Sequence, residues 1–387
     1  MNYFPRPYPD EVVGSLILRA CRHLGLAYKR IIQSIGSGPG AYGSFLLPSN
    51  LPRLGGLTGI SAERLLWEHT MFPYIVAFME PAEVVRLQRK ILNSCGDESS
   101  LSSLTKSVTH GTRFRRFCME CMQEDIDSKG ETCWYRSHLL PGNHLCLRHR
   151  SWLKETTIPL AGKGSRDISM PHDIAGRLYM THLSHVVLTT LTELSHAALS
   201  CRTRPAMDYR LEALQSGYRM PSGEVASRHL TDSLYRFYQD EFLIETGCWF
   251  DVKQRNPWPA LLARSDVGAP YAPPKHLLLA TFLKCGSADG KEREYGRPGP
   301  KVRDYDTEDR NCLLAIKGVL KEMERTGSRT TVQRLLTEAG CWSHFRHHRD
   351  KYPLTTEFLK AFRHSDRSKR QLGRRPYWRR RLGLDRA

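Results

Sequence analysis

Residues 113–149 read RFRRFCMECMQEDIDSKGETCWYRSHLLPGNHLCLRH, and the organisation of the whole chain follows from them. A Cys-x2-Cys pair (Cys118 and Cys121) and a Cys-x2-His pair (Cys146 and His149) are separated by 24 residues. Two such pairs are typical of a closed structural zinc site, in which four protein ligands complete a tetrahedron. No coordination position is then left for a water nucleophile, so we expect Zn²⁺ in a structural role.

The alternative is that these residues are ordinary buried thiols. Four chelating residues in two pairs within 32 positions disfavour that alternative. Cys133 lies between the pairs with no partner at the same spacing. We interpret it as a packing thiol beside Trp134 or, as a weaker alternative, as a replacement for one ligand. His138 and His144 lie near the site in sequence but at no ligand spacing, so we do not predict them as ligands.

The composition is that of a folded, strongly basic protein. The chain has 387 residues, 40% hydrophobic residues and seven Trp, which predicts two or three domains with real cores. Lys and Arg outnumber Asp and Glu by 58 to 40, a net charge of +18. This excess favours a polyanionic partner, and nucleic acid is the one that we predict; dispersed surface charge is the alternative.

The chain shows no sign of export or membrane insertion. Eleven Cys without an apolar leader favour a reducing compartment, where disulfides are rare. No window reaches the roughly 18 apolar residues that a membrane span needs. We therefore expect a soluble, intracellular protein with no membrane partner.

The predicted fold class is mainly α, a multi-domain helical protein with helix-turn-helix modules and a small zinc-ribbon-like insertion. The predicted organisation is an N-terminal helical domain (1–110), a zinc-binding module (111–160), a central helical domain (161–285), a linker (286–304) and a C-terminal domain with a basic tail (305–387). Helices over 11–24 and 28–35 around Gly25 form a first helix-turn-helix candidate or any small helical bundle. We expect loop over 36–60, a polar connector over 95–110, a helix over 176–200, and a further helix capped by Ser222.

The C-terminal part carries the candidate DNA contacts. Helices over 309–325 and 332–339, joined at Gly327-Ser328, form a second helix-turn-helix candidate. The basic tail supplies the main phosphate-contact candidates, Arg374, Arg375, Arg379, Arg380 and Arg381, with Tyr377 and Trp378 among them. Weaker candidates near the helices are Arg329, Arg334, Arg346 and Arg349. The alternative is a solvated tail, and the sequence assigns no base-reading side chain.

Several motifs together resemble the TniQ/TnsD family, the target-selection proteins of heteromeric bacterial transposons. In the zinc segment they are Cys118-x2-Cys121, Gly130-Glu131, Trp134, Arg136, His138-Leu-Leu-Pro141-Gly142 and Cys146-x2-His149. At the N-terminus they are Phe4-Pro5-x-Pro7-Tyr8-x-x-Glu11 followed by Ser15 and Arg19, and then Trp67 to Pro73. Trp258 and Pro273-x-x-His276 resemble the carboxy-terminal region of TnsD-like proteins. The specific motifs cover about 1–285, and 305–387 is similar more loosely.

The resemblance implies a non-enzymatic protein that binds attachment-site double-stranded DNA and recruits an AAA+ ATPase regulator, through which the transposase subunits of a DDE transposon are engaged. It also implies a bacterial, cytoplasmic, nucleoid-associated location. Met119 stands where the family usually has Pro. No second pair of cysteine knuckles follows His149, which favours a TnsD-like protein. The chain is shorter than a full-length TnsD, which leaves open a TniQ adapter for a CRISPR RNA-guided effector complex.

The sequence contains no Walker A loop and no nucleophile elbow. A zinc-containing nuclease built from Asp125, Asp127, Glu131 and His138 is a further alternative. It is disfavoured because a four-ligand zinc site needs no carboxylate.

Overall fold

The computed structural model describes residues 3–36, 44–93, 98–200, 207–264, 271–286, 305–325 and 331–362. The chain divides into two compact units, Met1–Lys291 and Glu292–Ala387. Helices predominate in the described residues, as the sequence predicts, and strands are few and short. None of the described helices combines the length and the apolar character needed to cross a membrane.

The first unit begins with seven helices. These are α1 (Val13–Leu24), α2 (Tyr28–Ile35), α3 (Leu51–Thr58), α4 (Ala62–His69), α5 (Phe72–Val76), α6 (Pro81–Asn93) and α7 (Glu98–Thr109). Gly25 ends α1 in the left-handed conformation, with φ of 61°, which glycine adopts without steric cost. The Ser61 side chain accepts a hydrogen bond from the backbone N–H of Arg64 and so caps α4. The predicted helices on either side of Gly25 are confirmed.

A small antiparallel sheet follows, with strand order β1-β2-β3. The strands are β1 (Phe114–Phe117), β2 (Lys154–Pro159) and β3 (Arg177–Leu178). Between β1 and β2 lie α8 (Met119–Lys129) and the 3-10 helix η1 (Arg136–Leu139), and after β2 come η2 (Lys163–Arg166) and η3 (Pro171–Asp173). In the register, Phe117 pairs with Lys154, and Lys154 with Leu178. The two ligand pairs therefore lie on the connection between the first two strands.

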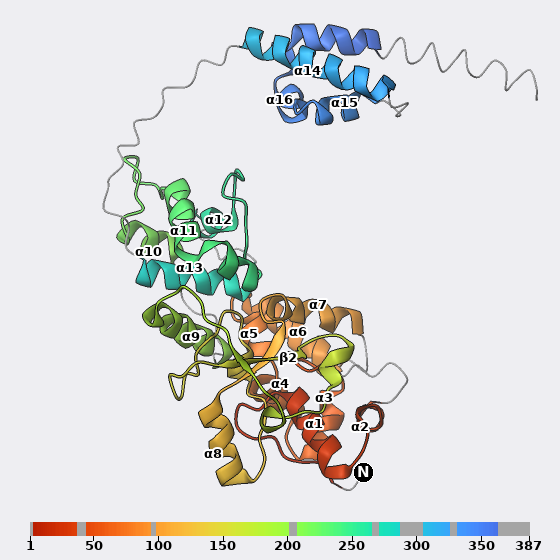
Figure 1. Ribbon diagram of the computed structural model, residues 1–387, viewed down its shortest axis with the longest axis vertical. Coiled ribbons are helices and arrows are strands. Elements are labelled where there is room, and N and C mark those ends of the chain that lie inside the picture. Colours follow the sequence, from red (N-terminus) through yellow and green to blue (C-terminus); the bar gives the residue numbers. More distant parts are fainter. Residues whose placement is uncertain are drawn as a thin grey trace, which may run out of the picture. The chain divides into compact units, whose positions relative to one another are not determined.

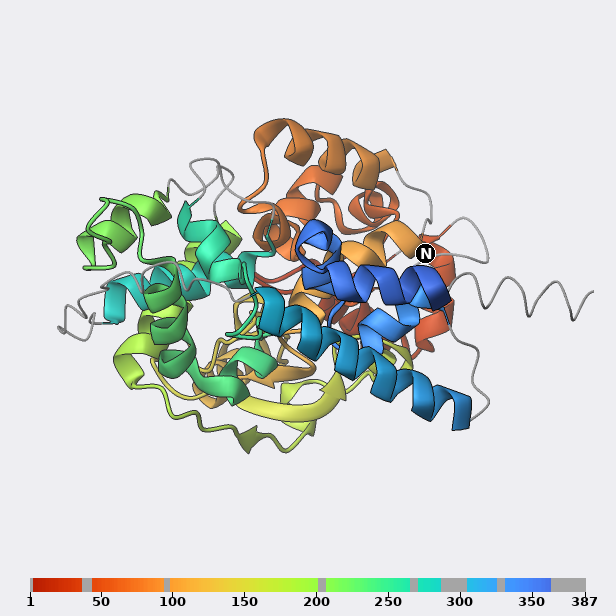
Figure 2. The ribbon, with the colours of Figure 1, turned by 90° about the horizontal axis from the view of Figure 1, so that it is seen from above.

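Five further helices follow in the described residues of the first unit. They are α9 (His185–Ser200), α10 (Tyr209–Gln215), α11 (Ser227–Glu245), α12 (Trp258–Arg264) and α13 (Pro273–Cys285). Helices α10–α13 gather in one part of the unit and α1–α7 in another, as both ribbon views show (Figures 1 and 2). Helix α9 packs against both α13 and α5. One hydrophobic core contains Val12, Trp134 and Leu278, so the segments predicted as three domains share a core; their boundaries stay a prediction.

The second unit has its own core. It contains α14 (Tyr305–Arg325), α15 (Val332–Glu338), α16 (Trp342–His347), the 3-10 helix η4 (Arg349–Lys351) and a helix over 353–362. Ile316, Leu335 and Phe345 are among its buried residues. Buried Asp309 of α14 accepts the backbone N–H groups of Leu354 and Thr355 at 2.7 and 3.0 Å, which caps the last helix.

Four local predictions were wrong. Residues 51–58 of the predicted loop form α3, because Leu51 and Leu54 are fully buried and a proline at its start favours the helix. The predicted connector contains α7, and α9 starts at 185 instead of 176 because residues 177–178 pair in the sheet. Ser222 lies in a turn before α11.

Neither helix-turn-helix is confirmed. Residues Val13–Cys21 of α1 are all buried, so that helix belongs to the core. The second candidate turn, Gly327-Ser328, and most of the predicted linker lie outside the described residues.

Candidate metal centre and the polar network behind it

The four predicted ligands lie close together, and each pair belongs to a different local structure. Cys118 follows β1 and stands immediately before α8, and Cys121 lies in the first turn of that helix. Cys146 and His149 lie in a turn closed by the bridge between Leu145 and Trp152, with the Cys146 N–H donating to the Ser151 carbonyl at 2.8 Å. The first pair thus belongs to a helix start, and the zinc-ribbon description is not confirmed.

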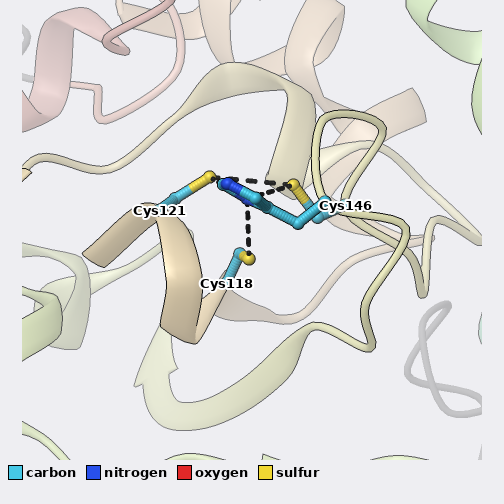
Figure 3. Close-up of side chains that lie close together, drawn as sticks. Cys118, Cys121 and Cys146 are labelled. Atoms are coloured by element: carbon cyan, nitrogen blue, oxygen red, sulfur yellow. Dashed lines mark hydrogen bonds between the residues drawn. The ribbon is translucent and has the colours of Figure 1, made fainter. Parts of the chain in front are cut away.

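The distances between the ligand atoms match those around a tetrahedral metal ion. His149 Nδ1 lies 3.5 Å from Cys118 Sγ, 3.3 Å from Cys121 Sγ and 3.7 Å from Cys146 Sγ. The Sγ atoms of Cys121 and Cys146 are 3.7 Å apart, and all four ligand atoms lie within 4.8 Å of one another. Zn–S and Zn–N bonds of about 2.3 and 2.0 Å place tetrahedral ligand atoms roughly 3.8 Å (S–S) and 3.5 Å (S–N) apart. Figure 3 shows the three thiols converging. The cluster can therefore hold a metal ion.

Side chains around the ligands orient them. The other ring nitrogen of His149, Nε2, lies 3.0 Å from Glu124 Oε1, and Glu124 also pairs with Arg148 at 2.7 Å. A carboxylate in this position directs the opposite ring nitrogen of a histidine to a metal. Ser151 Oγ lies 3.3 Å from Cys118 Sγ. The arrangement supplies the outer partners that metal sites commonly have.

The electrostatics of the cluster favour a bound cation. Hydrogen bonds from Cys118 and Cys121 lower the pKa of the Cys146 thiol to about 2. Hydrogen bonds with Cys118 and then Cys146 raise the pKa of Cys121, and burial and the charges of the two neighbouring thiolates add to this rise. Burial opposes the charge of His149, but hydrogen bonds to Glu124, Cys146 and Cys118 outweigh it and raise its pKa to about 9. A metal ion would hold these groups deprotonated together, so its binding would release protons.

The residues of the alternative nuclease centre do not converge on a metal. Asp125 accepts hydrogen bonds from Lys129 and Tyr135, and Asp127 accepts one from Gln123. Among the described residues, a single group of His, Cys and acidic side chains is placed to hold a metal, and it includes neither these carboxylates nor His138. Cys133 is buried 3.8 Å from Asp125 Oδ2, outside the group, as expected for a packing thiol.

An ion network around the buried Arg19 joins the segment between α8 and η1 to α1. Arg19, only 3% exposed, donates through Nη1 to Glu11 Oε2 and through Nη2 to Glu131 Oε1, each at 2.7 Å. Its guanidinium carbon lies 3.9 Å from the centre of the Tyr8 ring. His23 also contacts Glu131, at 2.7 Å. A loop residue is thus held by residues more than 100 positions earlier in the chain.

Backbone groups extend this junction. The Trp134 N–H donates to Ser15 Oγ at 3.0 Å, and the Val12 N–H donates to the Trp134 carbonyl at 2.9 Å. Arg136 pairs with Asp10 at 3.1 Å and donates to the carbonyls of Trp67 in α4 and of Thr70, which follows that helix. The sequence assigned no role to these residues. Two signals pointed to them: several belong to the motifs that resemble the TniQ/TnsD family, and the spacing of Glu11, Ser15 and Arg19 places them on one helix face.

A second buried arginine anchors the sheet to α11. Arg116 of β1, 3% exposed, pairs with Glu155 of β2 at 3.0 Å and with Glu245 of α11 at 2.9 Å. It also donates to the Asn143 carbonyl at 3.0 Å. The connection that carries the four ligands is therefore fixed to both helical parts of the unit.

The predicted DNA contacts are only partly described. Arg334 of α15 pairs with Glu338 at 2.7 Å, whereas Arg346 and Arg349 are exposed and line a common groove. The other six candidates lie outside the described residues: Arg329, Arg374, Arg375, Arg379, Arg380 and Arg381.

Comparison with known proteins identifies the first part of the chain. The TniQ family model matches residues 2–153, which include α1–α8, the first strand and all four ligands. The transposon Tn7 transposition protein TnsD of Escherichia coli is 27% identical over 157 residues, which cover 38% of this chain and 30% of the relative. The chain thus spans less than a third of that relative's length. Residues 2–153 are therefore a TniQ domain, and the two comparisons together support a TniQ/TnsD-family protein.

Proposed function

We propose that this protein selects the target site of a heteromeric DDE transposon. It binds attachment-site double-stranded DNA sequence-specifically and recruits an AAA+ ATPase regulator, through which the transposase subunits are engaged. The TniQ domain and the similarity to a Tn7 transposition protein support this role. In this proposal the protein binds and recruits, and the chemistry of strand transfer belongs to its partners.

The observation that carries the proposal is a TniQ domain on the same chain as a separately packed, strongly basic unit. The second unit contains 24 Lys and Arg against 13 Asp and Glu, so it holds +11 of the chain's net charge of +18. It has its own hydrophobic core. Such a concentration of positive charge is the electrostatic footprint of a nucleic-acid partner.

The metal centre has a structural part in this proposal. Cys118, Cys121, Cys146 and His149 would hold Zn²⁺ with all four positions filled by protein. A bound zinc ion would cross-link the start of α8 to the turn before β2. The loop that it closes carries Glu131, Trp134 and Arg136, which contact α1 and α4. The ion would thereby stabilise the contacts of this loop with α1 and α4.

The second candidate is a TniQ adapter that couples a CRISPR RNA-guided effector complex to the transposition machinery. It is favoured by one observation, namely that the similarity to TnsD is confined to 157 residues of this chain. An adapter would obtain its sequence specificity from the guide and would need few base contacts of its own.

Footprinting tests the proposal. The purified full chain is incubated, at near-physiological salt, with duplex DNA that flanks its own element. A discrete protected site is the expected result. Diffuse protection that disappears with modest added salt would contradict direct targeting and favour the adapter. Strand cleavage by the purified chain with Mg²⁺ or Zn²⁺ would instead support the nuclease.

A further inference from the structure

The second unit contains a groove that the proposed function does not explain. It lies among α15, α16 and the helix over 353–362 and has a volume of about 210 Å³. Leu336, Trp342, Phe345 and Leu359 contribute apolar and aromatic surface to it. The volume is below the roughly 300–1,000 Å³ of pockets that enclose a whole drug-sized ligand. The groove therefore fits a single ring system.

The charged side chains that line the same groove are all cationic. Arg346, Arg349 and Lys360 line it, and all three are exposed. No acidic residue is among the described residues that line the groove, and no carboxylate of the described chain pairs with these three cations. By contrast, Arg334 on the same helix as Leu336 is neutralised by Glu338. The groove thus combines an apolar floor with three positive charges that pair with no carboxylate of the described residues.

This combination restricts the chemistry of the occupant. The positive charge of the whole unit favours a nucleic acid over an acidic peptide. Duplex phosphates would use the three cations and leave the apolar floor empty, because paired bases are stacked inside the helix. An unstacked base has a flat apolar face that packs on aromatic side chains, while its flanking phosphates reach nearby cations.

We propose that this groove receives one unpaired nucleotide, with its base on Trp342 and Phe345 and its phosphates on Arg346, Arg349 and Lys360. The inference rests on the proposed function only in taking nucleic acid as the partner. It adds that the second unit binds locally opened DNA more tightly than fully paired DNA. Such a preference would direct the protein to a distorted or strand-separated target.

Fluorescence anisotropy with the full chain tests this preference. The probes are fluorescein-labelled oligonucleotides of one sequence, either as a perfect duplex or with a short mismatched bubble at its centre. One base–aromatic stack corresponds to roughly 5- to 150-fold in affinity, so we expect the bubble to bind at least about 5-fold more tightly. Trp342→Ala should remove this advantage and leave duplex affinity unchanged, whereas Trp342→Phe should keep most of it.

Cation variants separate phosphate contacts from stacking. Lys360→Ala should weaken binding of both probes and reduce the slope of log K against log salt by about 1. Arg325→Ala is the matched control, because Arg325 pairs with Glu322 on α14 and does not line the groove, and it should change neither. Since Trp342→Ala could unfold the unit, an independent measurement uses 5-iododeoxyuridine in the bubble. Its photochemical cross-link should fall on the peptide that contains Trp342.

The outcomes distinguish this inference from the proposed function. Equal affinity for bubble and duplex, or a cross-link in the first unit, would overturn this inference. The proposed function would still be supported if footprinting shows a discrete protected site on duplex DNA. A bubble preference that survives Trp342→Ala in a folded protein would also overturn the inference. A chain that binds neither probe would contradict both.

Discussion

Replacing Arg19 by methionine should destabilise the first unit strongly. The guanidinium group is 3% exposed and is held by Glu11, which is fully buried, by Glu131 and by the Tyr8 ring. Removing one partner of a buried ion pair leaves an uncompensated charge and costs about 3–5 kcal/mol. The matched control is Arg22→Met, one turn later in α1. Arg22 pairs with Asp173 at the surface, where such pairs are worth about 0–1 kcal/mol.

The penalty should depend on pH. Burial raises the pKa of Glu11 to about 7, although the charge of Arg19 and hydrogen bonds from Tyr8, Ser15 and Arg19 oppose this. The folded state therefore holds the proton more tightly than the unfolded chain, and stability falls as the pH rises from the unfolded value of 4.5 through the folded one. Loss of Arg19 raises the folded pKa further, so the decline extends to higher pH. Arg19→Met should cost more at pH 8 than at pH 5.

Urea unfolding followed by tryptophan fluorescence measures these free energies, since five of the seven Trp lie in the first unit. The double variant Arg19→Met with Glu11→Gln should recover about 2 kcal/mol relative to the sum of the single variants, because the neutral amide needs no counter-charge. The reasoning is refuted if Arg19→Met costs no more than Arg22→Met, or if the two changes are additive.

Three further predictions concern the metal centre, the stability at low pH and the basic tail. Cys146→Ser should lose Zn²⁺ and destabilise the fold by several kcal/mol, whereas the control Cys133→Ser should keep the metal. Elemental analysis measures the bound metal and thermal unfolding measures the stability. A Cys146→Ser protein that is folded and stable would contradict the structural role of the metal. Burial opposes ionisation of Glu131, but hydrogen bonds from Arg19, His23 and Tyr8 outweigh it and lower its pKa to about 2. The ionised Glu131 therefore adds about 1–2 kcal/mol to the free energy of unfolding after solvent screening; this contribution is present above pH 4.5 and lost as the pH falls towards 2. In a series of unfolding measurements at different pH, Glu131→Gln should be as stable as the unchanged protein only near pH 2. Alanine at 379–381 should weaken DNA binding alike for all sequences and reduce the salt slope by about 2–3, and an unchanged slope would mean a solvated tail.

What the sequence predicted correctly rests on local chemistry. The two ligand pairs are recognisable because each pair lies within one turn, and the structure brings all four residues together. Gly25 ends α1, as predicted, because glycine adopts the left-handed conformation without steric cost. The mainly helical class follows from the same short-range periodicity.

Local signals failed where burial overrode them. Helices α3 and α7 form in segments rich in Gly or Ser, because packing of residues such as Leu54 and Val108 outweighs weak helix propensity. The start of α9 was misplaced because residues 177–178 extend a sheet whose other strands lie earlier in the chain. Such partners have no fixed spacing in sequence.

Only the tertiary structure shows which distant residues the ligand-bearing segment contacts. Glu131 meets Arg19 across 112 positions, and Arg136 reaches the α4–α5 turn across 66. It also decided that Arg346 and Arg349 share a groove with Lys360, while Arg334 is neutralised by Glu338. The sequence determined the chemistry of each side chain, but its charge state, partners and exposure depend on packing between segments distant in the chain.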